Sequence, residues 1–370
     1  MSGRWNLDGS RGSPEFTFAL ACCKHSFWHG PRARPALQEA IDWERFFKLT
    51  QFHRIEGLAW AYLANCQAVV PQEIAAALKS AASTIAANNL LAQRDCRALR
   101  QAFEAANLQL LFLKGLTVGA LAYGNPAVKS AIDVDILIDP GQLDGAAKIL
   151  RSCGYSLIAP ADSPGDRLLQ RWHRGWKESV WRKRSPRLQI DLHTRVADNR
   201  RVIPAISVHS PRQWVEVADS LSLPTLGDDE LFAYLAVHGA SSAWFRLKWI
   251  ADFAGYLSGM NAETINRLYL RSQELGAGRA AGQALLLAHE LFETLRDNGA
   301  LLKQLRSDRR SQQLYRTALR LLTQNLSEPT QQRWGTLPIR ATQLLLLPGL
   351  SYKVFEISRQ VRRAVDRPSA

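Results

Sequence analysis

The stretch Ile132-Asp133-Val134-Asp135-Ile136-Leu137-Ile138 decides the fold of this chain. It is rich in β-branched residues and is followed by Asp139-Pro140-Gly141, a pattern typical of a β-strand that ends in a turn. Successive side chains of a strand point to opposite faces, so Asp133 and Asp135 share one face while the alternate apolar residues share the other. Two carboxylates therefore project together from this strand.

Neighbouring carboxylates repel each other unless solvent screens them or a cation neutralises them, and their hard oxygen atoms suit Mg²⁺ or Mn²⁺. A third carboxylate, Asp191, lies in a second strand-like segment, Leu188 to His193, which we expect to pair beside the first. Three carboxylates can hold two cations that activate an attacking hydroxyl and stabilise a leaving pyrophosphate. Asp133, Asp135 and Asp191 are therefore the predicted metal ligands and catalytic residues. An Asp-x-Asp alternation by itself is more often a solvated strand face, so this prediction depends on the order of the motifs.

A phosphate-binding loop is predicted upstream of these carboxylates. The apolar run from Leu108 leads into Lys114-Gly115 and then into a short helix that ends near Tyr123. Glycine lets the backbone approach a phosphate at the N-terminus of a helix, and lysine adds positive charge. The alternative interpretation of Lys114-Gly115 is an ordinary turn.

The order of the elements predicts an α/β unit between two helical regions. The α/β unit should read strand, helix, strand, helix, strand as far as Ile158, and two further strands should pair across the turn at 183–186. The expected divisions are a disordered segment over 1–36, a helical region over 37–107, the core over 108–200 and a C-terminal helical region over 201–370.

Helix signals recur in the C-terminal region. Asp228 or Asp229 is a predicted N-cap. Further helices are predicted over 262–275, 280–295 and 312–326. The last predicted helix, 352–363, is amphipathic and basic. We expect it to pack on the body with a solvated basic face, in preference to binding a membrane or RNA.

Composition narrows the class of partner. The 370 residues include 47 basic and 33 acidic side chains, a formal net charge of +14 that favours anionic partners such as nucleotides or nucleic acid. The five cysteines form no C-x-x-C pair, so neither a disulfide framework nor a zinc ribbon is indicated. No apolar run is long enough for a transmembrane helix or resembles a signal peptide, and we expect a cytoplasmic protein.

Several motifs together resemble the bacterial uncharacterised nucleotidyltransferases of the polymerase beta superfamily. The similarity covers roughly residues 40 to 260 and lies in Leu110-Leu-Phe-Leu-Lys-Gly115, Tyr123 with Asn125-Pro126, Ser130-Ala-Ile-Asp-Val-Asp-Ile-Leu-Ile138, Ile190-Asp-Leu-His193, Leu235-Ala-Val-His-Gly239 and Arg246-Leu-Lys-Trp-Ile-Ala-Asp252. The resemblance implies an α+β fold, in which a small polymerase beta-like nucleotidyltransferase core lies between N-terminal and C-terminal helical regions.

The resemblance also implies an activity and a site. The activity is transfer of a nucleoside monophosphate from an NTP to a hydroxyl of an acceptor, with Mg²⁺ or Mn²⁺ on the three aspartates. The implied nucleotide-binding residues are Lys114, Gly115, Lys129 and Ser130, and possible cleft residues are His193, His238 and Asp252. The chain departs from the wider superfamily in two places: Leu116 follows Gly115 where Gly-Ser or Gly-Gly is usual, and Lys129 stands where many relatives have arginine.

Other interpretations stay open at this stage. His238 and Asp252 fit a helix-packing pair equally well. The acceptor can be a small molecule, a protein or an RNA end, and the basic residues at 177, 182–184 and 187 can guide an acceptor that carries phosphate. A catalytically silent homologue that binds nucleotide or a partner, and a basic nucleic-acid-binding protein, are the two alternative functions.

Overall fold

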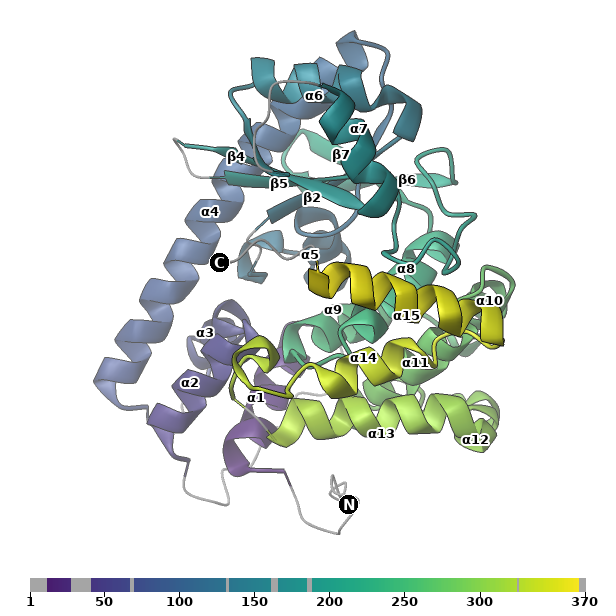
Figure 1. The fold of residues 1–370 in the computed structure, drawn as a ribbon. Helices are drawn as coiled ribbons and strands as arrows, with labels where there is room; N and C mark the ends of the chain where they lie inside the picture. Colours follow the sequence, from purple (N-terminus) through teal and green to yellow (C-terminus); the bar gives the residue numbers. More distant parts are fainter. Residues whose placement is uncertain are drawn as a thin grey trace.

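The computed structural model describes residues 12–27, 41–66, 70–130, 133–160, 166–184, 188–324 and 326–365. Within these residues the chain forms an α+β fold, in which one mixed sheet of five strands is covered by helices on both faces (Figure 1). The predicted fold class is therefore confirmed. None of the helices in the described ranges is long and apolar enough to cross a membrane.

The sheet has the strand order β1-β2-β5-β4-β3. Its strands are β1 (Leu110–Phe112), β2 (Asp133–Ile138), β3 (Ser156–Ala159), β4 (Glu178–Lys183) and β5 (Leu188–His193). The central pair, β2 and β5, runs parallel, and the other neighbours run antiparallel. The strands predicted from the sequence are thus all present, and the strand that carries Asp191 pairs with the strand that carries Asp133 and Asp135, as predicted.

The two faces of the sheet meet different environments. Val134, Ile136 and Ile138 of β2 lie in a core that includes the C-terminal half of α4 (Gln72–Ala105) and α6 (Leu143–Ser152). Leu137, on the opposite face of the same strand, lies in the larger core of the helical body. Asp133 and Asp135 alternate along β2 with the residues of the first core. They therefore share the face of Leu137 and point toward the helical body. Burial of the apolar face fixes the register, because a shift of one residue would expose that whole face.

Helices make up most of the remaining chain, and Figure 1 shows α6 and α7 on one side of the sheet and the helical body on the other. The other helices are α1 (Pro14–His25), α2 (Trp43–His53), α3 (Glu56–Leu63), α5 (Leu116–Tyr123), α7 (Asp166–Gly175), α8 (Asp228–Ser241), α9 (Leu247–Leu257), α10 (Ala262–Glu274), α11 (Gly278–Phe292), α12 (Gly299–Ser307), α13 (Arg309–Gln324), α14 (Leu337–Gln343) and α15 (Leu350–Val365). These include the C-terminal helices predicted over 262–275, 280–295, 312–326 and 352–363.

The expectation of disorder over 1–36 is wrong for the segment that forms α1. Ser13 caps this helix by accepting a hydrogen bond from the Phe16 amide, and proline occupies its first turn. Phe16 and Phe18 are buried, and Phe18 packs edge to face on Phe46 of α2. The prediction failed because the partners that bury these aromatic side chains lie elsewhere in the chain. Residues 1–11 and 28–36 lie outside the described part of the chain.

The region predicted as C-terminal and helical, 201–370, also contains a β-hairpin that the sequence analysis did not predict. Strands β6 (Arg212–Ala218) and β7 (Leu221–Leu226) pair antiparallel and join the core below β1, with Val215, Val217, Leu221 and Leu223 buried. In β7 proline is tolerated at the edge of a two-stranded sheet. The following helix, α8, has Gly227 as its N-cap, and Asp228 lies in its first turn without capping it.

Contact between α5 and α9 connects the sheet to the helical body. A Cβ added to Gly255 of α9 would lie 2.8 Å from the backbone oxygen of Ala122 in α5, so only glycine allows the two helices to approach this closely. Because α5 begins directly after β1, this contact sets the distance between the aspartates on the sheet and the side chains that α9 presents to them.

Replacing Gly255 by alanine is expected to force α9 away from α5 and to lower the free energy of unfolding by about 1–3 kcal/mol. Chemical denaturation measures this change. Gly299→Ala is the matched control, because nothing lies within 4 Å of the added Cβ at the start of α12. If the two variants were equally stable, the contact between α5 and α9 would have room for a side chain at position 255, and this account of Gly255 would be wrong.

Candidate nucleotide and metal site

A cleft lies between the carboxylate face of the sheet and helices α5, α8 and α9. Its described lining residues are Lys114, Gly115, Val118, Lys129, Ser130, Asp133, Asp135, Leu235, His238, Trp244, Lys248, Trp249 and Asp252. Eight of the ten predicted site residues are in this set. The other two, Asp191 and His193, lie on β5 directly beside β2. The structure therefore brings the predicted residues into one region of the molecule.

The carboxylates stand side by side on the two parallel central strands. Asp135 of β2 and Asp191 of β5 are register partners, and Asp133 lies opposite Gln189. Asp135 is 2% exposed and Asp191 is 9% exposed, so water screens little of their mutual repulsion. Gln189 donates a hydrogen bond from Nε2 to Asp191 Oδ1 over 3.0 Å.

Positive groups reach Asp135 but not Asp191. Lys114 Nζ and His193 Nε2 both lie 2.9 Å from Asp135 Oδ1. Burial opposes the ionisation of Asp135, yet Lys114 and His193 outweigh it and hold the pKa of this carboxyl well below its usual range. Burial, followed by the charges of Asp135 and Asp133, raises the pKa of Asp191 to about 8. One carboxyl is thus ionised, while its neighbour retains a proton near neutral pH.

This donor set matches the chemistry of a hard divalent cation. The three aspartates supply oxygen ligands, and the raised pKa of Asp191 shows that the cluster lacks positive charge. As the side chains are placed, however, no three His, Cys, Asp or Glu residues of the described ranges are close enough to hold a metal ion. Lys114 contacts the Asp135 oxygen that a cation would use, so a bound cation would compete with this lysine.

Gly115 and Lys114 owe their position to the end of β1. The Leu113 amide donates to the backbone oxygen of Asp135 over 3.0 Å, so the chain leaves the sheet directly beside the carboxylates. Gly115 then turns the chain into α5 with φ of 68°, a value that favours glycine. The lysine before this turn consequently points back over β2.

Helix α9 supplies a second group of charges. Lys129 forms an ion pair with Asp252, which also accepts a hydrogen bond from the Tyr123 hydroxyl over 3.0 Å. Lys248 Nζ donates to the backbone oxygen of Ser130 over 3.1 Å. Burial, together with Lys129, lowers the pKa of Lys248 to about 7. Lys248 was not predicted as a site residue, although it lies within the Arg246–Asp252 motif, where its spacing of four residues from Asp252 places both on one helix face.

Helix α8 and the turn after it form the wall of the cleft. Burial and the charges of Lys114 and Lys177 keep the pKa of His238 well below its usual range, so its imidazole is neutral at pH 7. The ring meets Trp249 edge to face, with 5.8 Å between the ring centroids. His238 therefore lines the cleft and also packs between helices, so both interpretations of this residue hold.

Glu178 of β4 is a further charged residue that the sequence did not single out. Its Oε2 lies 3.3 Å from His193 Nε2 and 2.5 Å from Lys177 Nζ. A series of contacting polar side chains therefore extends from the cleft along the sheet. It consists of Asp135, His193, Glu178 and Lys177. Of the predicted basic hairpin, Lys183 lies on the opposite face, where it pairs with Asp95 over 3.2 Å, and residue 187 lies outside the described ranges.

Comparison with protein families gives a match. A family model described as uncharacterised nucleotidyltransferase matches residues 39–293. This range is more than half of the chain and includes the whole sheet and all of the described lining residues of the cleft. A search among curated proteins found no match.

The raised pKa of Asp191 predicts how stability depends on pH. An aspartate ionises near pH 4 in the unfolded chain and near pH 8 in this cluster, so without divalent cations the wild type should lose stability as pH rises from 4 to 8. Asp191→Asn should remove this loss and be more stable than wild type at pH 8.5 by on the order of 1–2 kcal/mol.

Thermal and urea unfolding at pH 5 and pH 8.5 measure this difference. Added Mg²⁺ should stabilise the wild type at pH 8.5 more than it stabilises Asp191→Asn. The control is Asp219→Asn in the exposed turn of the β6–β7 hairpin. If the wild type were more stable to heat and urea than Asp191→Asn at pH 8.5 in EDTA, this result would contradict the electrostatic account of the carboxylate cluster.

Proposed function

This chain belongs to the uncharacterised nucleotidyltransferase family, and from this premise we propose that it transfers a nucleoside monophosphate from an NTP to a hydroxyl group of an acceptor. The observation that carries the proposal is the register of Asp135 and Asp191 on adjacent parallel strands, with three lysines facing the same cleft. Negative ligands for a cation and positive groups for phosphate are the two requirements of this reaction.

Asp133, Asp135 and Asp191 would hold Mg²⁺ or Mn²⁺. A divalent cation in this place neutralises charge on the phosphates and lowers the pKa of a nearby hydroxyl. The aspartates suit this task because two of them are buried and one retains a proton in the absence of added positive charge.

The residues of the chain account for the remaining parts of the reaction. The acceptor hydroxyl oxygen bonds to the α-phosphorus as the bond from that phosphorus to the bridging oxygen of pyrophosphate breaks, and pyrophosphate leaves with the electron pair. The hydroxyl proton passes to Asp191 when this carboxyl is ionised, and a pKa of about 8 without added positive charge leaves both of its protonation states within reach of neutral pH. Lys114, Lys129 and Lys248 attract the phosphates.

The size of the cleft indicates how much of the nucleotide it encloses. Its free volume is about 50 Å³, enough for a few water molecules or one phosphate group. The base and ribose would therefore extend beyond the enclosed part. Trp249, which lines the cleft and is half-buried, supplies apolar surface against which a base or sugar can pack.

Calorimetric titration with each of the four NTPs, with and without Mg²⁺, tests the donor site. We expect magnesium-dependent binding in the wild type and a loss of about 100-fold or more in affinity in the Asp133→Asn, Asp135→Asn double variant, because the cation ligands are removed. Asp219→Asn should bind like wild type. Release of pyrophosphate from an α-labelled NTP then measures transfer.

Three results would point to the alternatives. Nucleotide binding without transfer to any hydroxyl compound would favour a catalytically silent homologue. A nucleic-acid-binding protein would be favoured if the affinity for RNA or DNA fell steeply with salt and were unchanged by Asp133→Asn. Absence of NTP binding to the wild type in Mg²⁺ would overturn the proposal.

Lys248→Met should weaken NTP binding by about tenfold at pH 6.5, because an ammonium group that faces phosphate is lost while the aliphatic stem is kept. The pKa of Lys248 is about 7, so the charged fraction of the wild-type side chain falls as pH rises. The difference between wild type and Lys248→Met should therefore shrink at pH 8.5. Lys353→Met on the exposed side of α15 is the control, and an equal effect of the two substitutions would contradict this role.

A further inference from the structure

A second cavity lies where α15 crosses the end of the sheet. It has a volume of about 170 Å³, and it opens between the C-terminus of α7, the segment that follows β5, and α15. Its described lining residues are Arg174, Gly175, Trp176, Arg195, Asp198, Arg200, Phe355, Arg359, Arg362 and Arg363. We call it the arginine pocket.

The charge of the arginine pocket is strongly unbalanced. Of its described lining residues six are arginines and one, Asp198, is acidic. Asp198 pairs with Arg363 over 3.5 Å and Glu356 pairs with Arg359, which leaves four of the six arginines without an acidic partner among the described residues. Like charges held together in this way repel each other, and this repulsion destabilises the folded chain unless an anion binds in the pocket. Planar guanidinium groups around one cavity match the oxygen atoms of phosphate.

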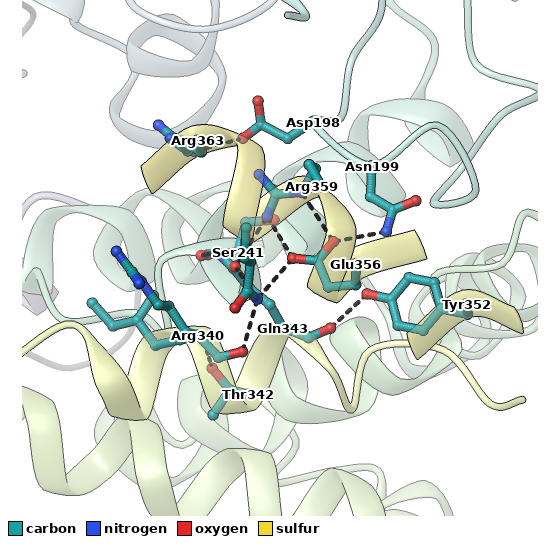
Figure 2. A network of polar contacts seen from close by, with 12 residues as sticks. Asp198, Asn199, Ser241, Arg340, Thr342, Gln343, Tyr352, Glu356, Arg359 and Arg363 are labelled. Atoms are coloured by element: carbon teal, nitrogen blue, oxygen red, sulfur yellow. Dashed lines mark hydrogen bonds and ion pairs between the residues drawn. The ribbon is translucent and has the colours of Figure 1, made fainter. Parts of the chain in front are cut away.

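A buried network holds Arg359 of α15 in place (Figure 2). Glu356, which is 1% exposed, accepts hydrogen bonds from Asn199 over 2.7 Å and from Arg359 over 2.5 Å. Arg359 also donates to Gln343 Oε1 over 3.1 Å, and the Tyr352 hydroxyl donates to the Gln343 backbone oxygen over 2.5 Å. Arg359 is thus fixed before any ligand binds, which lowers the entropic cost of binding to this side chain.

Arg195 forms the floor of the arginine pocket. Its Nη1 and Nη2 donate to the backbone oxygens of His173 and Gly175 over 2.8 and 2.9 Å, while its Nε is buried without a hydrogen-bond partner among the described residues. Burial, then Arg200, lowers the pKa of this guanidinium to about 10. The two hydrogen bonds fix the plane of the Arg195 guanidinium beside the cavity.

Trp176 gives the pocket an aromatic wall. It stacks on Trp172 with 5.0 Å between ring centroids, and the Arg363 guanidinium lies 5.7 Å from its ring. Both contacts hold side chains at the mouth of the cavity.

The arginine pocket and the carboxylate cleft lie on one line along the sheet. Arg195 follows Asp191 by four residues, so the Cα atoms of the two residues lie no more than about 14 Å apart. Lys177 and Glu178 link the two sites, because they follow Trp176 of the pocket and Glu178 contacts His193, which in turn contacts Asp135 of the cleft. A small molecule can therefore span the distance from one site to the other.

We propose that the arginine pocket binds the phosphate groups of the acceptor, so that the substrate is a small phosphorylated compound whose free hydroxyl reaches Asp191. This inference rests on the proposed nucleotidyl transfer. A bounded pocket of about 170 Å³ fits a small organic phosphate better than it fits an extended nucleic-acid strand. The pocket binds one end of the acceptor, and the carboxylate cleft holds the NTP.

Binding of inorganic tripolyphosphate in EDTA tests the pocket without a cation in the cleft. Arg174→Glu combined with Arg362→Glu should weaken this binding by about 100-fold, because two charge-assisted contacts become repulsive. Both side chains are exposed, and neither belongs to the buried network of Glu356. Lys79→Glu combined with Lys353→Glu changes the net charge equally on exposed sites outside the pocket, and should leave the affinity within about threefold of wild type.

Magnesium-dependent NTP binding, measured on the same two double variants, separates this inference from the proposed function. Unchanged NTP binding with lost tripolyphosphate binding in the pocket variant supports the inference. Equal tripolyphosphate affinity in both double variants overturns it, whatever happens to NTP binding. If the wild type does not bind NTP in Mg²⁺, the proposed nucleotidyl transfer is overturned instead. The assignment of the bound phosphate to an acceptor is then overturned with it.

Transfer of label from an α-labelled NTP gives the second readout. Sugar phosphates and other phosphorylated alcohols should accept label, and the same compounds after phosphatase treatment should not. The pocket variant should then show a raised KM for the acceptor with an unchanged KM for NTP. Binding of a single-stranded RNA that displaces tripolyphosphate, with no labelled small-molecule product, would overturn the inference in favour of a nucleic-acid site.

Discussion

The structure depends on how it offsets the repulsion between carboxylates held together on one buried face of a sheet. Register places Asp135 beside Asp191, and burial removes the water that would otherwise screen them. Lys114 and His193 stabilise the charge of Asp135, and Asp191 instead keeps its proton. Lys114 before α5, Lys129 before β2 and Lys248 of α9 bring positive charge to the cleft over this face.

Two cores allow such a face to exist. Val134 and Ile136 pack into the core beneath the sheet and hold β2 rigid, while the helical body closes over the opposite face without covering the aspartates. The close approach of α5 and α9 then sets the width of the cleft. A polar cleft between two packed apolar layers has a low local dielectric, which strengthens every charge interaction within it.

The cleft and the arginine pocket differ in their balance of charge. Lysines alternate with carboxylates in the cleft, so its positive groups already have partners there. The arginine pocket has guanidinium groups in excess, and Glu356 beneath it serves to hold Arg359 in position. A reaction between two anionic substrates needs two separate sites of positive charge, and the proposed acceptor end and donor end would each have one.

The sequence by itself determined the strand that carries Asp133 and Asp135, its pairing with the strand of Asp191, and the family, because alternation and local motifs are written in consecutive residues. It did not determine α1 or the β6–β7 hairpin, whose apolar side chains become buried only against distant elements. Lys248, Glu178 and the arginine pocket were likewise decided by tertiary structure. Their partners lie on other helices and strands, and no spacing along the chain encodes a contact between a C-terminal helix and the end of a central sheet.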